Sequence, residues 1–186
     1  YFFVANPVRV KIAEYNESKA LKMNLHPKKS AQREIKCGSD YFIAGEDASQ
    51  LEKGEVFRLK DHFNVKVVKK EMNGKGVKEK DIGAIQIADM WKIVGEFAGQ
   101  EPVAGAKKLH WVSALQGEFL ECEVLKYGVL LDEKDEFDPH SLEKFEGYCE
   151  KACAQLKEGD IIRFERFGFC RLDKKNGGKL TFIYSG

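Results

Sequence analysis

The chain has 186 residues, 43% of them hydrophobic and 33% charged, which indicates a globular protein of one domain or two small ones. Its formal net charge of +1 excludes a general polyanion binder. The composition therefore leaves a folded protein whose function depends on local sites.

The sequence also argues against a membrane or secreted protein. No apolar stretch reaches the roughly 18–20 residues that cross a bilayer, and no signal peptide is present. The five cysteines, odd in number and irregular in spacing, favour a reducing cytosol over a disulfide framework. Because the chain begins at Tyr1, without a methionine and inside a predicted strand, we expect a fragment of a longer protein.

Charged residues are unevenly distributed along the chain. A lysine-rich segment contains Lys60, Lys66, Lys69, Lys70, Lys75, Lys78 and Lys80. An acidic segment contains Glu118, Glu121, Glu123, Asp132, Glu133, Asp135 and Glu136. The lysine-rich segment is a candidate surface for an anion, and the alternative is that both segments are solvated.

The first half of the chain predicts short strands. Residues 7–12 alternate between apolar and basic side chains, which is typical of a half-buried strand. Residues 24–29 contain a proline and predict a loop, and residues 41–43 predict a short strand. Residues 63–70 predict another strand.

Residues 55–60 form the most informative strand of this half. Phe57 and Leu59 fall on one face, while Arg58 and Lys60 project from the other, about 7 Å apart. Two neighbouring cations on a rigid strand suit a phosphate or a base edge. The alternative is a solvated outer face.

His110 is the next candidate for chemistry. A histidine can ligate a metal or act as a base, but no carboxylate or cysteine stands at ligand spacing beside this one. We therefore favour a structural histidine. Residues 118–131 predict two further strands, broken at Gly128.

One short helix is predicted over residues 141–156. The apolar side chains recur there at three- and four-residue steps, at Leu142, Phe145, Cys149, Cys153 and Leu156. On a helix Cys149 and Cys153 share one face. Without a second pair of ligands nearby, this pattern favours a core position over a zinc site.

The stretch from Ile161 to Asp173 alternates arginine with phenylalanine. It is followed by Asn176-Gly177-Gly178 and a second apolar run at residues 180–184, which predicts a β-hairpin. Guanidinium groups and exposed aromatic rings suit nucleic acid, because they reach phosphates, base edges and unpaired bases. The alternative is a core strand with solvated charges.

The elements together predict a mostly-β protein, either barrels or sandwiches. We find no glycine-rich phosphate loop, no nucleophile elbow and no complete zinc motif, so no catalytic residue and no metal ligand is assigned. Two alternatives to RNA binding remain. One is a small-ligand β-barrel, and the other is a thiol or zinc enzyme that uses Cys149, Cys153 and His140.

Several motifs in this order resemble a known family. They are Asn6-Pro-Val-Arg-Val-Lys-Ile12, His26-Pro27, Gly54-Glu-Val-Phe-Arg-Leu-Lys60, Leu109-His-Trp-Val-Ser-Ala114 and Phe164-Glu-Arg-Phe-Gly-Phe169. Over nearly its whole length the chain resembles the C-terminal anticodon-binding region of class I glutamyl- and glutaminyl-tRNA synthetases. Its last motif is most similar to the archaeal glutamyl enzymes.

The resemblance implies an all-β fold of two β-barrels of the ribosomal protein L25 type, with one or two short helices. The distal barrel is expected to be an insert formed by residues 17–111. The proximal barrel is expected to combine residues 1–16 with residues 112–186. A catalytic domain is expected upstream of residue 1.

The resemblance also implies RNA-binding residues. Arg58 and Lys60 match two basic residues on the first anticodon base and its phosphates. Arg163 stands where the glutaminyl relatives have a glutamine on the middle base, and Arg166 matches an arginine at the anticodon loop. Gln50 lies where those relatives have a Lys-Arg pair for the third base, and this departure favours a glutamyl identity.

Strict alternation places Arg163 and Arg166 on opposite faces of a flat strand, so both cannot reach one RNA loop. Either the strand bends or bulges near residues 166–168, where Gly168 permits it, or Arg166 serves the barrel. We favour the bend.

The function that the resemblance implies is that of an anticodon-binding fragment of a glutamate–tRNA ligase in the cytoplasm. Its partners would be tRNA-Glu and its own upstream catalytic domain, with neither DNA nor membrane. ATP and Mg²⁺ would serve the parent enzyme, and no cofactor is expected in the fragment. The alternative within the family is the same region of a glutaminyl-tRNA synthetase.

Overall fold

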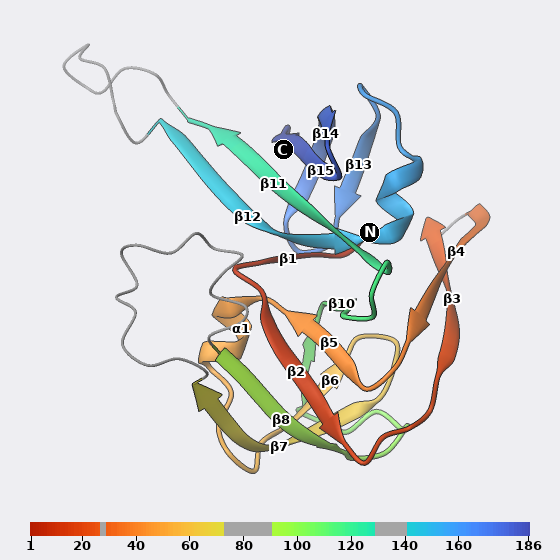
Figure 1. Cartoon of the computed structure of the whole chain (residues 1–186), viewed down its shortest axis with the longest axis vertical. Helices are drawn as coiled ribbons and strands as arrows, with labels where there is room; N and C mark the ends of the chain where they lie inside the picture. The colour runs from red at the N-terminus through yellow and green to blue at the C-terminus, as the bar shows by residue number, and fades with distance from the viewer. Residues whose placement is uncertain (27–28, 73–90, 129–140) are drawn as a thin grey trace.

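A computed structural model describes residues 1–26, 29–72, 91–128 and 141–186, and it consists almost entirely of strands (Figure 1). The predicted all-β class is confirmed. Two short helices occur in the described ranges, α1 (Gly45–Ser49) and the 3-10 helix η2 (Lys151–Gln155). No helix within these ranges has the length and apolar character to span a membrane.

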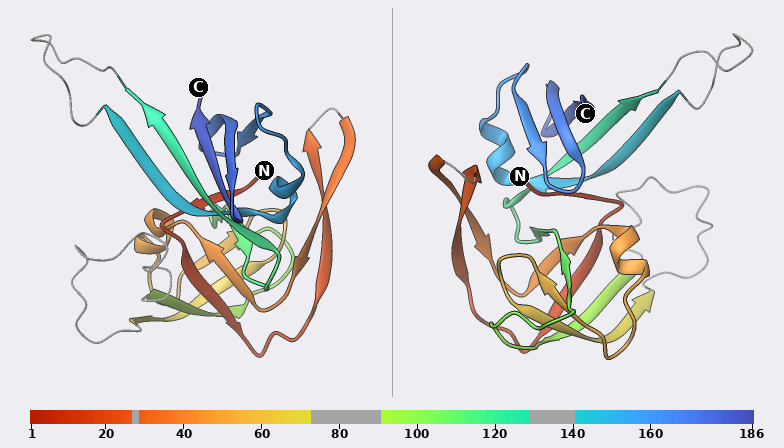
Figure 2. Two further views of the ribbon diagram at one scale, coloured as in Figure 1. Left: turned by 45° about the horizontal axis from the view of Figure 1, so that its top comes forward. Right: turned by 180° about the vertical axis from the view of Figure 1, so that it is seen from behind.

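The larger sheet has seven strands and curls back on itself (Figures 1 and 2). In sheet order its strands are β10 (Trp111–Ser113), β5 (Asp40–Ile43), β2 (Val8–Ala13), β8 (Trp91–Phe97), β7 (Asn64–Met72), β6 (Val56–Leu59) and β9 (Lys107–Leu109). The two edge strands, β9 and β10, follow one another in the chain with only His110 between them. The sheet is therefore a nearly closed barrel.

The second sheet has six strands. In sheet order they are β1 (Phe3–Ala5), β12 (Leu142–Glu150), β11 (Phe119–Tyr127), β15 (Lys179–Tyr184), β14 (Gly168–Asn176) and β13 (Ile161–Phe164). Two backbone hydrogen bonds join its edges at one end. The Tyr1 nitrogen donates to the Arg163 carbonyl oxygen at 3.0 Å, and the Glu165 N–H donates to the Tyr1 carbonyl oxygen at 3.0 Å.

A separate hairpin stands beside both sheets. Strands β3 (Lys19–His26) and β4 (Lys29–Cys37) pair only with each other among the described strands. Met23 and Ile35 are buried in the same core as the seven-stranded sheet, so the inner face of the hairpin packs against the barrel. Figure 1 shows the far end of the hairpin rising toward the six-stranded sheet.

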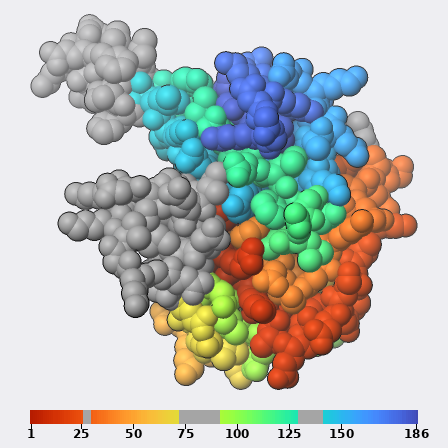
Figure 3. Space-filling view, viewed as in Figure 1, coloured from red at the N-terminus to blue at the C-terminus, as the bar shows by residue number. Residues whose placement is uncertain are grey.

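The two sheets pack through aromatic side chains. Phe42 of β5 lies 4.7 Å from Tyr148 of β12 and 5.2 Å from Phe119 of β11, measured between ring centroids. Figure 3 shows the green residues that follow β10 in contact with both the blue C-terminal strands and the red and orange first strands. These aromatic contacts join strands β11 and β12 of the six-stranded sheet to strand β5 of the barrel.

The helix predicted over residues 141–156 is wrong. Residues 142–150 form β12, which pairs with β1 on one side and with β11 on the other, and only η2 is helical. A Cβ at Gly147 would lie 2.0 Å from the Val4 carbonyl oxygen, so the two backbones approach closely there. Cys149 and Cys153 are buried in the core of the six-stranded sheet, the position favoured over a zinc site.

The predicted continuous strand from Ile161 to Asp173 is two strands. β13 ends at Phe164, and the chain turns through residues 165–167 before β14 begins at Gly168. The deviation expected near residues 166–168 is therefore a complete turn. The predicted hairpin at Asn176-Gly177-Gly178 is confirmed, because β14 and β15 pair antiparallel with Asn176 opposite Lys179.

The loop expected over residues 24–29 is wrong at both ends, because β3 continues to His26 and β4 begins at Lys29. Four expected strands are present. The strands expected at residues 41–43, 55–60 and 63–70 are β5, β6 and β7. The strand expected at residues 7–12 is β2, and it pairs inside the seven-stranded sheet with β5 and β8. The division into two barrels at residues 16/17 and 111/112 stays a prediction.

Some expectations fall partly or wholly outside the described residues. His140 and the lysines from Lys75 to Lys80 lie there, as do residues 129–131 of the second strand expected near Gly128. Strand β11 ends at Tyr127, next to the predicted break.

Candidate RNA-binding site

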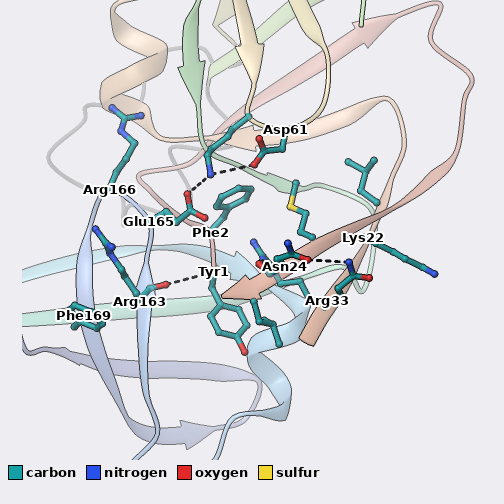
Figure 4. A pocket seen from close by; sticks show the side chains of 15 residues that line it. Tyr1, Phe2, Lys22, Asn24, Arg33, Asp61, Arg163, Glu165, Arg166 and Phe169 are labelled. Atoms are coloured by element: carbon teal, nitrogen blue, oxygen red, sulfur yellow. Dashed lines mark hydrogen bonds and ion pairs between the residues drawn. The ribbon is translucent and has the colours of Figure 1, made fainter. Parts of the chain in front are cut away.

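A cavity of about 850 Å³ lies where the hairpin, the start of the chain and the turn after β13 come together (Figure 4). The hairpin contributes Lys22, Asn24 and Arg33 to its lining. Tyr1 and Phe2 line its floor from the start of the chain. The cavity is therefore lined by segments that lie far apart in the sequence.

Three of the predicted RNA-binding residues line this cavity: Lys60, Arg163 and Arg166. Lys60 follows β6 in the seven-stranded sheet, Arg163 lies on β13, and Arg166 lies in the turn after it. Their convergence could not be read from spacing, because about a hundred residues separate Lys60 from the other two.

Lys60 is paired with carboxylates. Its Nζ forms an ion pair with Glu165 and lies 3.3 Å from Asp61 Oδ2. Burial is the largest single effect on Lys60 and lowers its pKa, but the hydrogen bonds and charges of Glu165 and Asp61 together outweigh it, so the pKa of Lys60 is raised above the ordinary value. Its carbonyl oxygen also accepts a hydrogen bond from the Trp111 indole at 3.0 Å. Lys60 is therefore a fixed cation at the rim.

Glu165 connects the two sheets. Its Oε2 binds Lys60 and lies 3.3 Å from His110 Nε2. Burial is the largest single effect on Glu165 and raises its pKa, but Lys60 and His110 together outweigh burial, so the pKa of Glu165 is lowered. Burial lowers the pKa of His110, whose ring meets the edge of Phe2 at a centroid distance of 4.9 Å. These contacts support the structural interpretation of His110.

Arg166 also spans the two sheets. Its guanidinium group donates two hydrogen bonds to Asp47 on α1, at 3.0 and 3.2 Å. The backbone at Arg166 has φ of 64°, which places this residue in the turn and aims its side chain at the barrel. The side chain thus lines the cavity and holds α1 at the same time. Seen from behind, this turn points toward α1 (Figure 2).

Arg163 differs from the other two cations. It is exposed, and no carboxylate of the described residues forms an ion pair with it. Its guanidinium carbon lies 5.7 Å from the centre of the Phe169 ring, and the two residues are directly opposite one another on β13 and β14. The donors of Arg163 are therefore available to a ligand in the cavity.

Arg58 does not line the cavity. Its alternation with the buried Phe57 is as predicted, but its guanidinium group donates to Asn64 Oδ1 at 3.0 Å, to the Gln100 carbonyl at 2.8 Å and to the His62 carbonyl at 2.9 Å. These bonds hold the loops next to β6 and β7.

Gln50 also lies away from the cavity. It is exposed at the C-terminal end of α1, where its carbonyl oxygen accepts a hydrogen bond from Lys107 Nζ at 3.3 Å. Of the five predicted RNA-binding residues, Lys60, Arg163 and Arg166 line the cavity, and Arg58 and Gln50 do not.

Arg33, which lines the cavity, belongs to a buried ion pair that sequence reasoning missed. Arg33 of β4 binds Glu150 at the end of β12, with Nη2 at 3.0 Å from Oε1, and both side chains are buried. The same Glu150 oxygen accepts the Phe2 N–H at 2.7 Å, and Arg33 also donates to the Asn24 carbonyl at 2.8 Å. This network ties the hairpin to the end of β12 in the six-stranded sheet.

The chain matches one family of RNA-binding domains in two segments. Residues 1–85 and residues 108–173 each match a model described as "tRNA synthetases class I (E and Q), anti-codon binding domain". The two segments together include every predicted RNA-binding residue.

Curated relatives are similar over the whole chain. A protein of Pyrococcus furiosus named "Glutamate--tRNA ligase" is 33% identical over 100% of this chain and 28% of its own length. Proteins of the same name from Methanocaldococcus jannaschii and Korarchaeum cryptofilum are 30% and 28% identical, again over 100% of this chain. The chain spans 27% and 28% of the lengths of these three relatives. The chain belongs to the anticodon-binding domain family of the class I (E and Q) tRNA synthetases.

Proposed function

We propose that the chain is the anticodon-binding part of a glutamate–tRNA ligase and that it holds the unpaired anticodon bases of tRNA-Glu in the cavity beside β13. The observation that carries this proposal is the convergence of Lys60, Arg163 and Arg166 on one cavity. The relatives named above are glutamate–tRNA ligases, which favours glutamate over the glutaminyl alternative.

The three cations have different tasks in this proposal. Arg163 donates hydrogen bonds to the edge of a base, because its guanidinium group is exposed and has no carboxylate partner among the described residues. Lys60 and Arg166 approach phosphates, and there an RNA oxygen competes with Glu165 or Asp47 for the same donors. In this proposal Arg163 binds RNA without giving up a carboxylate partner, whereas Lys60 and Arg166 exchange a carboxylate for a phosphate.

The charging reaction is assigned to residues outside this chain. ATP and Mg²⁺ would be bound by a catalytic domain of the longer protein, in the cytoplasm. Among the residues described here, no three His, Cys, Asp or Glu side chains are grouped to hold a metal ion, and we assign none as a Mg²⁺ ligand. The domain described here would contribute by positioning the tRNA.

Binding of labelled tRNA-Glu to the 186-residue chain, followed by fluorescence anisotropy, tests the proposal. We expect Arg163→Ala to weaken binding by roughly 5- to 150-fold, the range for loss of one base contact. Arg171→Ala is the matched control, because Arg171 is exposed on the same hairpin, pairs with Asp173 at 3.0 Å and does not line the cavity.

A tRNA-Glu whose three anticodon bases are replaced serves as the second arm of this experiment. It should bind the wild-type chain as weakly as tRNA-Glu binds Arg163→Ala. Equal binding of the two tRNAs by the wild-type chain would refute the proposal.

A further inference from the structure

Phe169 is a large apolar side chain that folding leaves in contact with water. Its relative exposure is 49%, and it lines the cavity beside Arg163 (Figure 4). Ile161, two residues before Arg163, is 65% exposed but does not line the cavity. Single apolar residues scattered over a surface are common and need no special explanation. An exposed aromatic ring inside a basic cavity, in contrast, suggests a role in binding.

The backbone holds the Phe169 ring in a fixed place. The Phe169 N–H donates to the Gly186 carbonyl at 2.6 Å, and its carbonyl oxygen accepts the Ser185 N–H at 2.8 Å. On the other side, Phe169 is opposite Arg163 in the register of β13 and β14. Phe169 is therefore held by backbone hydrogen bonds between β13 on one side and the two residues that follow β15 on the other, so its ring has a fixed position.

Phe169 and Arg163 together have the two groups that an unpaired base requires. A half-exposed ring offers a flat apolar surface on which a base of any identity can stack. The guanidinium group, 5.7 Å from the ring centre, supplies donors that can reach carbonyl oxygens on the edge of a stacked base. Uracil and guanine both present such oxygens, so the pair suits a base that carries a carbonyl group on its exposed edge.

We propose that Phe169 is a base-stacking residue of this domain: one unpaired base of the bound RNA stacks on its ring while Arg163 donates to the edge of that base. The inference rests on the proposed function and adds a contact that carries no charge. A protein surface is the other chemical class that an exposed ring can serve. The unpaired Arg163 and the rim of Lys60 and Arg166 favour RNA.

The test uses an anticodon stem-loop RNA of tRNA-Glu with a fluorescent base analogue placed in turn at each anticodon position. We expect Phe169→Leu to weaken binding by roughly 5- to 150-fold and to abolish the change in emission at one position. Phe169→Tyr keeps the ring and should bind within about twofold of wild type. Tyr127→Leu removes an aromatic ring that is 59% exposed and distant from the cavity lining, and it should change nothing.

The salt dependence separates stacking from charge. Phe169→Leu should leave the slope of log K against log salt unchanged, whereas Lys60→Ala, which removes a proposed phosphate contact, should make it shallower by about 0.7. Thermal unfolding of each variant controls for folding, and an exposed Phe169 should tolerate leucine.

The two proposals fail in different ways. If Phe169→Leu binds like wild type with the same emission while Arg163→Ala weakens binding, Phe169 is not a stacking residue and the proposed function stands. A ring that serves a protein partner gives this same result. If the wild-type chain does not distinguish the stem-loop from one with replaced anticodon bases, the proposed function itself fails.

Discussion

Two of the three predicted RNA-binding cations at the cavity are neutralised within the protein itself. Lys60 pairs with Glu165, and Arg166 makes two hydrogen bonds with Asp47. An RNA phosphate has to displace a carboxylate at each of them, whereas Arg163 donates without such an exchange. At this scale Arg163 is therefore the residue whose removal should matter most for affinity.

Gly168 allows the chain to turn into β14, and its replacement should be costly. Its φ is 132°, and a Cβ there would lie 2.5 Å from the ring of Tyr184 and 3.2 Å from the Gly186 carbonyl oxygen. We expect Gly168→Ala to lower the free energy of unfolding in urea by about 2–4 kcal/mol, through strain and overlap together. Gly159→Ala is the matched control, because φ there is 93° with open space around it, and it should lose only about 1 kcal/mol. Equal losses would show that the contact with Tyr184 is irrelevant.

His62 makes stability depend on pH. Its side chain is buried, and Tyr41, whose hydroxyl donates to the Gly38 carbonyl at 2.6 Å, accepts a hydrogen bond from His62 Nε2 at 2.9 Å. Burial, with Lys19 and Arg58 nearby, lowers the pKa of His62 to about 4. Between pH 6.5 and about 4 the unfolded chain therefore binds a proton that the folded chain does not.

The resulting loss of stability has a defined direction. The contribution of His62 is complete above pH 6.5 and falls by up to about 1.4 kcal/mol per pH unit as the pH drops toward 4. Urea unfolding at several pH values measures the slope, and NMR titration of each imidazole separates His62 from His110, whose pKa is lowered in the same direction. A His62 ring that titrates near its ordinary pKa of 6.5 would contradict this prediction.

The alternation of residues 55–60 predicted which side chains of β6 point outward, but it did not predict the partners that these side chains contact. Phe57 and Leu59 are buried as expected, which leaves Arg58 and Lys60 outside. Arg58 then meets the Gln100 carbonyl and Lys60 meets Glu165, partners that are 42 and 105 residues away. Periodicity fixes the face of a strand, but only the fold decides what lies across from it.

At the scale of elements, the missed strand β12 shows where local pattern fails. Its apolar residues recur at helical steps, yet the segment pairs with β1 and β11, and its last four residues are buried. A strand hydrogen-bonded on both sides and covered at one end need not show strict alternation. A helix over residues 141–156 would be short and only marginally stable by itself. The pairing of β12 with β1 and β11 therefore outweighed the helix propensity of this segment.

The Arg33–Glu150 pair should be essential to how the hairpin packs. Glu150→Gln leaves the Arg33 guanidinium buried beside a neutral amide, and we expect the free energy of unfolding to fall by about 3–5 kcal/mol. The double variant Arg33→Met/Glu150→Gln should lose less than the sum of the single variants, because no buried charge is left unpaired.

An exposed pair on neighbouring strands provides the control for this prediction. Lys126 Nζ lies 2.8 Å from Glu143 Oε1 on β11 and β12, and Lys126→Gln should change stability by less than about 1 kcal/mol. Urea unfolding measures all the variants. Strict additivity of the two single changes would contradict the coupling proposed for Arg33 and Glu150.

At the scale of the whole molecule, many lysines of the described residues are paired with carboxylates or carbonyl oxygens, which reduces their general attraction for RNA. The lysines of β7 that the sequence offered as an anion surface are largely paired, with Lys66 at 3.2 Å from Glu96 and Lys69 in an ion pair with Glu71. Lys70 Nζ donates to the Ser49 carbonyl at 3.2 Å. The count of lysines in this segment therefore overstated its attraction for an anion, because the acidic partners come from the same or a neighbouring strand.

The salt dependence of RNA binding should accordingly be modest. The net charge is +1, and of the cations that line the cavity only Lys60 and Arg166 are proposed to contact phosphates, so we expect log K to fall with log salt with a slope of about −1.4 for a single-stranded loop. Anisotropy titrations of the anticodon stem-loop between about 50 and 200 mM salt measure the slope. Lys66→Ala/Lys69→Ala should leave it unchanged, because these lysines are neutralised within β7 and β8. A slope near −5 that this double variant makes shallower would mean that RNA crosses the outer face of the barrel and not only the cavity between the sheets.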